Sequence, residues 1–350
     1  MPSLSGQPNI SLTVYATASD FLFATYDILM QKEEQSNIIL PFALNQQRRE
    51  QQAARGQNAP PPTNNLWICV WTTRMASRGS APKPTLDFVF AINDNSFGGY
   101  PLFIWSNYPA SELMPSFLDR RVQLAAMQLY QSTPAERVFS VFGLAPVVSS
   151  FRSIWSHITG KQAELVPFYA AKFTLCTKFT LQPSIGVPAG DLIRPAAAHD
   201  VEQVARLCQE FAEDSVFFPL NSKESMAQAQ QLIRDKQLWV YETRDAHNRP
   251  CVASIVASSR SSARVAAITK VYTPPAFRGR KYALRLVQWV AQQLLYCDGK
   301  ESVVLYVSHE NPAEKVYHRV GFAGLCGTPR PVVVEDWLEI GFKDTIRGHW

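Results

Sequence analysis

The stretch from Thr269 to Ala283, TKVYTPPAFRGRKYA, constrains the fold of this 350-residue chain more than any other segment. A strand-like run ends at two prolines, and a basic, glycine-containing turn then leads directly into an amphipathic helix. This order places turn amides and the positive end of a helix at one point, which predicts an anion site, for example for a pyrophosphate. The alternative is a solvated basic helix start. The basic side chains around the turn are Arg278, Arg280, Lys281 and Arg285.

The C-terminal half predicts a mixed α/β domain. Its apolar periodicity gives the order β-α-α-β-β-β-α-β-α-β, and a Pro- and Gly-rich segment over 183–190 predicts a linker before it. Asp200 with Gln203 predicts a capping box at the start of the first helix. Helices are expected from Asp200, Ser222, Ala283 and Asn311, and strands at Leu192–Ile193, Leu238–Glu242, Cys251–Ser258, Arg264–Thr273, Ser302–Ser308 and Trp337–Phe342.

The N-terminal half has nearly the same order of predicted elements. Two matching orders, half a chain apart, predict a divergent internal duplication, and the alternative is an unrelated α/β domain. We therefore expect domains over 1–182 and 191–350. The Gln- and Pro-rich stretch 46–65 is expected to be a long loop inserted in the first domain.

Composition limits the class of protein. A net charge of +5 with 46% apolar residues is typical of a globular protein and indicates neither nucleic acid nor membrane as partner. The start, MPSLSGQPNISL, does not resemble a secretory signal, and no apolar run reaches the ~20 residues of a membrane span. We expect a soluble cytoplasmic protein, with the nucleus also compatible, and no metal. The cysteines show no CxxC pair or zinc spacing: Cys69, Cys176, Cys208, Cys251, Cys297 and Cys326.

Two motifs in the C-terminal half carry a resemblance to a known family. Arg278, Lys281 and Ala283 take positions of the signature Gln/Arg-x-x-Gly-x-Gly/Ala, with Lys281 in place of the usual glycine. Residues 311–322, NPAEKVYHRVGF, follow the pattern Asn-Pro-x(4)-Tyr-x-x-x-Gly-Phe. Together they resemble the GNAT superfamily of acetyl-CoA-dependent N-acetyltransferases, over roughly 191–350. The ending, DWLEIGFKDTIRGHW, is similar to that of uncharacterised fungal GNAT-type proteins.

The resemblance implies an α/β (α+β) acyl-CoA N-acyltransferase fold with a mixed central sheet, in tandem with a degenerate N-terminal copy. It implies an acyltransferase that moves an acetyl group from acetyl-CoA, its cosubstrate, directly onto an amine. The acceptor would be a small amine or an amine of a peptide or protein. The alternative is an inactive acyl-CoA-binding or scaffold protein. Lysine at 281 can offer its amide if φ is negative, or it can crowd the phosphates.

The resemblance also implies roles for individual residues. Backbone groups of Val271 and Thr273 would hold the pantetheine and the thioester, in a cleft made where their strand splays from Ser302–Ser308. Asn311 would face the pantetheine arm or cap its helix. Tyr317 would protonate the departing thiolate, or would be a core aromatic. The phosphate loop would contribute Arg278, Gly279, Arg280, Lys281, Tyr282 and Ala283.

The general base is not defined by a motif. The central strand, RVAAITKVYT, has no Asp or Glu. His309 is the first candidate, because the pKa of histidine suits the task and the residue directly follows a strand. The other candidates are Glu213, Asp214 and Glu242, and a water without a dedicated base is a further option.

The matching loop of the N-terminal half lacks these features. Its sequence, SNYPASELMPSFLDRR, has no glycine and contains Glu112, which would repel phosphate. No Asn-Pro-x(4)-Tyr pattern follows Phe142. We expect this half to have no cofactor site and to shape the substrate cleft or stabilise the other half.

Overall fold

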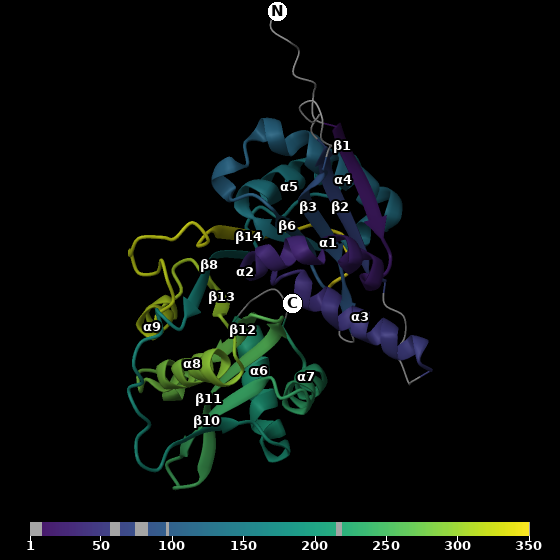
Figure 1. Cartoon of the computed structure of the whole chain (residues 1–350). Helices are drawn as coiled ribbons and strands as arrows, with labels where there is room; N and C mark the ends of the chain where they lie inside the picture. The colour runs from purple at the N-terminus through teal and green to yellow at the C-terminus, as the bar shows by residue number, and fades with distance from the viewer. Residues whose placement is uncertain (1–8, 57–63, 74–82, 96–97, 215–218, 350) are drawn as a thin grey trace, which may run out of the picture. The chain divides into compact units, whose positions relative to one another are not determined.

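The computed structural model describes residues 9–56, 64–73, 83–95, 98–214 and 219–349 (Figure 1). It contains two compact units. Unit 1 comprises Met1–Ala170 and Glu335–Trp350, and unit 2 comprises Ala171–Val334. Each unit therefore includes a strand from the opposite half of the sequence, whereas the expected domains, 1–182 and 191–350, divide the chain once. That those two domains fold independently stays a prediction.

Unit 1 has a mixed sheet in the order β1-β2-β3-β6-β7-β14. Neighbouring strands are antiparallel except β6 and β7, which are parallel. The strands are β1 (Asn9–Tyr15), β2 (Leu66–Thr73), β3 (Thr85–Ile92), β6 (Leu102–Ser106), β7 (Ser140–Leu144) and β14 (Asp336–Gly341), beside a hairpin of β4 (Asp94–Asn95) and β5 (Gly98–Gly99). The helices are α1 (Ala18–Gln31), α2 (Glu33–Ser36), α3 (Leu40–Ala54), α4 (Pro115–Ser132) and α5 (Ala145–Thr159), with short 3-10 turns η1 (Ala110–Glu112) and η2 (Ala135–Arg137).

Helix α3 corrects one expectation. The stretch 46–65 was expected to be a loop, but α3 continues to Ala54, and residues 57–63 of that stretch lie outside the described residues. Gln, Arg, Glu and Ala are good helix formers, so a polar composition alone does not exclude a helix. Glu50 adds a tertiary contact, because its carboxylate accepts the amides of Ala18 (2.8 Å) and Ser19 (3.0 Å) at the start of α1. This carboxylate stabilises both helices.

Unit 2 has a mixed sheet in the order β8-β13-β12-β11-β10-β9. Only β12 and β13 are parallel. The strands are β8 (Tyr169–Thr177), β9 (Leu192–Pro195), β10 (Leu238–Arg244), β11 (Pro250–Ser261), β12 (Val265–Tyr272) and β13 (Ser302–Ser308). The helices are α6 (Val201–Asp214), α7 (Ser222–Arg234), α8 (Tyr282–Gln292) and α9 (Glu314–Val320), with 3-10 turns η3 (Ala198–Asp200) and η4 (Pro275–Phe277) and a π-helical turn η5 (Gln293–Cys297).

The sheet of unit 2 is covered on both faces. Helices α8 and α9 lie on one side of its strands, and α6 and α7 lie on the other (Figure 1). Two consecutive residues of β11 face opposite sides of the sheet, since Val256 packs with α8 and Ile255 packs with α6. The expected apolar stripe of α8 is confirmed, because Leu284, Val287 and Ala291 are all buried. Among the described residues, no helix is both long and apolar enough to cross a membrane.

Glu339 of β14 is a fully buried acid in unit 1. Its Oε1 accepts a hydrogen bond from the Ser140 hydroxyl (2.6 Å), and its Oε2 has no hydrogen-bond partner among the described residues. Burial raises the pKa of Glu339 to about 7, against the opposing effect of the Ser140 hydrogen bond. The side chain is therefore largely neutral below this pH, which is how a buried carboxyl without a cation avoids the cost of desolvating a charge.

Glu339 predicts how stability depends on pH. Below pH 4.5 both the folded and the unfolded chain carry the proton, so the residue has no effect there. Between pH 4.5 and about 7 only the folded chain retains it, so the free energy of unfolding falls with pH, by about 3 kcal/mol in total. Glu339→Gln should remove this slope and be the more stable protein at pH 8, in urea unfolding at several pH values.

The exposed Glu301 provides the control, since Glu301→Gln should leave the profile unchanged. A Glu339→Gln profile parallel to that of the wild type would show that Glu339 is ionised in the folded protein.

Candidate functional site

Strands β12 and β13 run parallel and then part. They pair only over Val265–Ala267 and Ser302–Val304. Beyond that point β12 remains paired with β11 as far as Tyr272, and β13 remains paired with β8 as far as Ser308. The splay expected from the resemblance is confirmed. It leaves two facing strand edges, 268–272 and 305–308, whose backbone groups do not pair with each other.

A β-bulge in β12 lies where the two strands part. Ser258 pairs with Ile268 and Ala257 pairs with Lys270, so Thr269 is the extra residue. Its hydroxyl shares a hydrogen bond with Ser259 (2.8 Å). A bulge increases the local twist and changes the side chains' alternation. Here Val271 packs with the α8 core, and Lys270 lies on the opposite face.

The loop after β12 presents backbone donors at the start of α8. Gly279 (φ +80°) and Lys281 (φ +65°) both have left-handed backbone, and α8 begins at Tyr282 without a side-chain cap. In the described part of the chain, no protein group accepts a hydrogen bond from the amides of residues 279–284. Consecutive amides in such a turn, next to a helix N-terminus, form a concave site for an anion.

Lys281 has the backbone conformation of the glycine that it replaces. The possibility that it offers its amide at negative φ is wrong, since φ is +65°. For an L-residue this conformation costs about 1–2 kcal/mol. The lysine side chain is exposed. The sequence departs from the signature here, and Lys281 adopts a left-handed backbone that glycine would adopt without strain.

Two of the expected phosphate-binding arginines brace the loop. Arg278 Nε donates to the carbonyl of Thr273 (3.0 Å). Arg285 donates from Nε to the carbonyl of Gly186 (2.8 Å) and from Nη1 to that of Arg280 (2.9 Å). Within the described residues, Arg280, Lys281 and Arg285 form no ion pair with a carboxylate, so the loop keeps its positive charge.

The segment 183–190, expected to be a linker, is fastened along α8. Gln288 is only 2% exposed, and its Nε2 donates to the carbonyls of Gln182 (2.8 Å) and Pro183 (2.6 Å). Its Oε1 accepts the amide of Ile185 (3.3 Å). Together with the Arg285 contact, these bonds fix the segment to the helix whose N-terminus is the candidate anion site.

Asn311 and Tyr317 follow β13, the second of the two diverging strands. Tyr317 is 8% exposed and packs in the core shared by α8, α9 and β13, against Phe322 at 5.9 Å. Asn311 Oδ1 accepts the amide of Ala313 (2.9 Å), and α9 itself begins later than expected, at Glu314. Of the two roles expected for Asn311, its hydrogen bond supports that of a cap.

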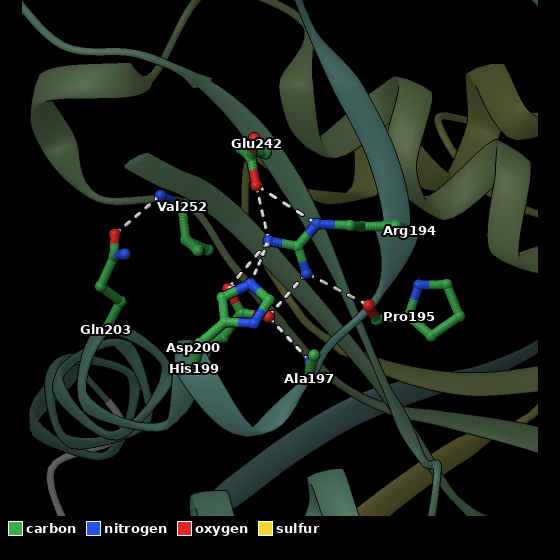
Figure 2. A network of polar contacts seen from close by, with 8 residues as sticks. All are labelled: Arg194, Pro195, Ala197, His199, Asp200, Gln203, Glu242 and Val252. Atoms are coloured by element: carbon green, nitrogen blue, oxygen red, sulfur yellow. Dashed lines mark hydrogen bonds and ion pairs between the residues drawn. The ribbon is translucent and has the colours of Figure 1, made fainter. Parts of the chain in front are cut away.

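Glu242 is already paired and is a poor candidate for the base. Figure 2 shows the Arg194 guanidinium between Glu242 (2.5 Å) and Asp200 (2.6 Å), which holds β9, β10 and the start of α6 together. These partners raise the pKa of Arg194 further, so it is always charged. The expected capping box is wrong, because Asp200 accepts the amide of Ala197 (2.8 Å) and Gln203 accepts that of Val252 (2.9 Å).

The other base candidates are spread over unit 2. His309 is exposed in the turn after β13, near Glu314, which is paired with Lys172 at 2.8 Å. Glu213 is exposed on α6 and accepts a hydrogen bond from Gln209 (3.3 Å). The side chain of Asp214 lies outside the described residues. Of these candidates, only His309 follows one of the diverging strands.

Lys270 is a residue that sequence reasoning missed. It is partly buried on β12, and its Nζ lies 4.0 Å from the ring centroid of Phe211 on α6. Burial lowers the pKa of its ammonium group, against an opposing effect of Cys208. The lysine is visible in the run RVAAITKVYT, but its contact with Phe211 cannot be read from the sequence.

Comparisons with known proteins agree with this geometry. Residues 251–328 match the family described as FR47-like protein. A GCN5-related N-acetyltransferase from Sphaerobacter thermophilus has a similar structure, with 14% identity, 95% of each chain covered and a TM-score of 0.50. A tandem GNAT protein from the clavulanic acid biosynthesis pathway matches with 14% identity, covering 95% of this chain and 98% of its own, at a TM-score of 0.46. No curated protein matches this chain.

The fold is therefore that of the GCN5-related N-acetyltransferases. The expected fold class, an α/β fold with a mixed central sheet, is confirmed. The resemblance of the C-terminal half to this superfamily is confirmed too, by a family match that contains residues 278–283 and Tyr317.

The strain at Lys281 predicts a stabilising substitution. Lys281→Gly removes the left-handed penalty but adds freedom to the unfolded chain, so the free energy of unfolding should rise by about 0.5–1 kcal/mol. Lys236 provides a matched control, because it is exposed and also has left-handed backbone (φ +56°). Urea unfolding of Lys236→Gly should show the same gain. A gain at 236 with a loss at 281 would mean that the Lys281 side chain stabilises the loop.

Proposed function

We propose that unit 2 catalyses transfer of an acetyl group from acetyl-CoA to an amine, either a small molecule or an amine of a peptide or protein. The observation that carries this proposal is the place where β12 and β13 part, directly beside a turn whose amides have no protein acceptor. A cleft lined by strand edges suits an extended thioester arm. The amides and the cationic loop suit the pyrophosphate attached to it.

The residues present fit acetyl-CoA. The amides of residues 279–284 and the charges of Arg280 and Lys281 would hold the phosphates. The free edge of β12, including Val271, would hold the pantetheine through backbone groups, and Thr273 continues that edge. The cosubstrate supplies an activated acetyl thioester when it is bound. Asn311 keeps its position at the cleft by capping the turn before α9.

The chain's own groups then assist a direct transfer. An amide of β12 near Val271 stabilises negative charge on the carbonyl oxygen as the amine nitrogen bonds to the carbonyl carbon. Tyr317 donates its hydroxyl proton to the sulfur as the carbon–sulfur bond breaks. The amine loses one proton to water or to a base, for which His309 is the candidate directly after β13, and Tyr317 regains a proton from solvent. The products are an amide and the free thiol.

The corresponding loop of unit 1 supports placing the site in unit 2 only. After β6, the amide of Ala110 donates to the carboxylate of Glu335 (2.6 Å), so a carboxylate of the chain takes a donor there. Pro115 begins α4 and has no amide hydrogen to offer. Three further amides are bonded within the loop, those of Glu112, Leu113 and Met114.

A second candidate function is acyl-CoA binding without catalysis. The absence of a carboxylate from β12 favours this alternative, because an amine nucleophile must lose a proton. Both functions predict binding of acetyl-CoA, and only the first predicts a role for the Tyr317 hydroxyl.

The first prediction concerns the cosubstrate. Wild-type protein should bind acetyl-CoA, and Lys281→Glu should weaken binding at least tenfold, because it places a carboxylate beside the phosphates. The variant should remain folded, since an acidic residue at a helix N-terminus is favourable. Isothermal titration calorimetry measures both dissociation constants. Lys236→Glu, at a residue with a similar backbone but remote in sequence from the loop, should bind like the wild type.

Two outcomes would count against this arrangement. No binding by the wild type overturns the proposed function. Equal binding by the wild type and Lys281→Glu would show that the phosphates do not lie at the start of α8.

The second prediction concerns Tyr317. Tyr317→Phe should lower kcat by roughly 10²-fold and leave the dissociation constant of acetyl-CoA unchanged, because only proton donation is lost. Release of the CoA thiol measures the rate. Tyr296→Phe is the control, since this tyrosine is 56% exposed in η5. An unchanged kcat for Tyr317→Phe would mean that Tyr317 is a packing residue.

A further inference from the structure

Lys270 lies on the face of the sheet opposite α8. Its neighbours there are Phe211 and Cys208 on α6 and Tyr272, which follows it by two positions on β12. The ammonium rests against the Phe211 ring at 4.0 Å, a cation–π contact. The bulge at Thr269 places this cation where β12 separates from β13.

No carboxylate of the described residues pairs with Lys270. The described acids nearest to Phe211 along α6 have other partners, since Glu210 faces Arg206 (4.0 Å) and Glu213 accepts from Gln209 (3.3 Å). A partly buried ammonium supported by a ring and a thiol retains most of its desolvation cost. An anion beside it would remove that cost.

Helix α6 covers part of this face, but Thr269, Lys270 and Tyr306 are each only partly buried there. On the α8 side, Val271 and alternate residues of β13 (Val303, Leu305 and Val307) pack in the core that contains α8 and α9. If the proposed function holds, so that the thioester lies between the diverging strands, an amine reaches its carbonyl carbon from the opposite side. That is the side of Lys270, Thr269 and Tyr306, the last of which alternates with the core residues Leu305 and Val307.

We propose that the acceptor carries an anionic group, a carboxylate in the simplest case, which pairs with the Lys270 ammonium and positions the amine for acetylation. The substrate class is then the amino acids and related amino carboxylates, and Lys270 is a specificity-determining residue. The same cation opposes protonation of a nearby amine, so it favours the neutral nucleophile on a strand that has no carboxylate base. Polyamines are disfavoured by repulsion between like charges.

The test compares each amino acid with its decarboxylated amine. The pairs are tyrosine and tyramine, tryptophan and tryptamine, histidine and histamine, and lysine and cadaverine. In wild-type protein at least one amino acid should exceed its amine by tenfold or more in kcat/KM. Calorimetric titration into protein saturated with CoA should show the same order of affinities. Lys270→Met, which keeps the side chain's length and removes its charge, should abolish the difference in both measurements.

Lys223→Met is the control, because this lysine is exposed at the start of α7. Equal or better use of the amines overturns the proposal and leaves the acetyltransferase function standing. A preference for amino acids that persists in Lys270→Met also overturns it. Binding of acetyl-CoA without turnover of any pair removes both the substrate class and the catalytic function, whereas failure to bind acetyl-CoA removes the proposed function at its first step.

Discussion

The separation of β12 from β13 is the constraint on which the candidate site depends. Each of the two strands keeps an antiparallel partner on its outer edge, β11 and β8, while the parallel ladder between them ends at Ala267 and Val304. The outer ladders supply the hydrogen bonds that hold the strands rigid, so the inner edges can remain unpaired. The bulge at Thr269 bends β12 away at the same place, and α8 then starts beside the opening. The candidate site is therefore formed by backbone groups held in place by the fold rather than by flexible side chains.

The same logic explains the tolerance for lysine at position 281. The site depends on the direction of backbone amides, which φ and ψ determine, and a lysine forced to φ +65° gives nearly the direction that glycine gives. The left-handed conformation of Lys281 lowers the free energy of unfolding of the protein. The braces made by Arg278 and Arg285 to carbonyls of the loop and of the 183–190 segment hold the turn in this conformation. Two of the basic side chains of the loop, Arg278 and Arg285, thus stabilise its backbone. The side chains of Arg280 and Lys281 are exposed and form no such hydrogen bonds among the described residues.

Much of this arrangement could be predicted from sequence where local signals are strong. The run SVVLYVS predicted β13 with its observed bounds, because an apolar strand covered on both faces has no polar interruption. Features that depend on tertiary contacts were missed. Helix α3 is polar, and Glu50 anchors it to α1. Asp200 and Gln203 looked like one capping box, but each accepts an amide from a different segment (Figure 2). Lys270 resembles any strand lysine until its position over the Phe211 ring is known.

The two units have similar strand arrangements, but they differ in whether the backbone amides of one loop have acceptors within the protein. Both place a parallel strand pair of three residue pairs before a helix, β6 with β7 and β12 with β13. In unit 1 the amides of Ala110, Glu112, Leu113 and Met114 in the intervening loop have protein acceptors, that of Ala110 being the Glu335 carboxylate. Burial raises the pKa of that carboxyl despite this bond. In unit 2 the donors at residues 279–284 have no acceptor in the described chain. A backbone that leaves donors unsatisfied is stable only if water or an anion accepts from them, so this difference in hydrogen bonding is what makes the loop of unit 2 the candidate binding loop.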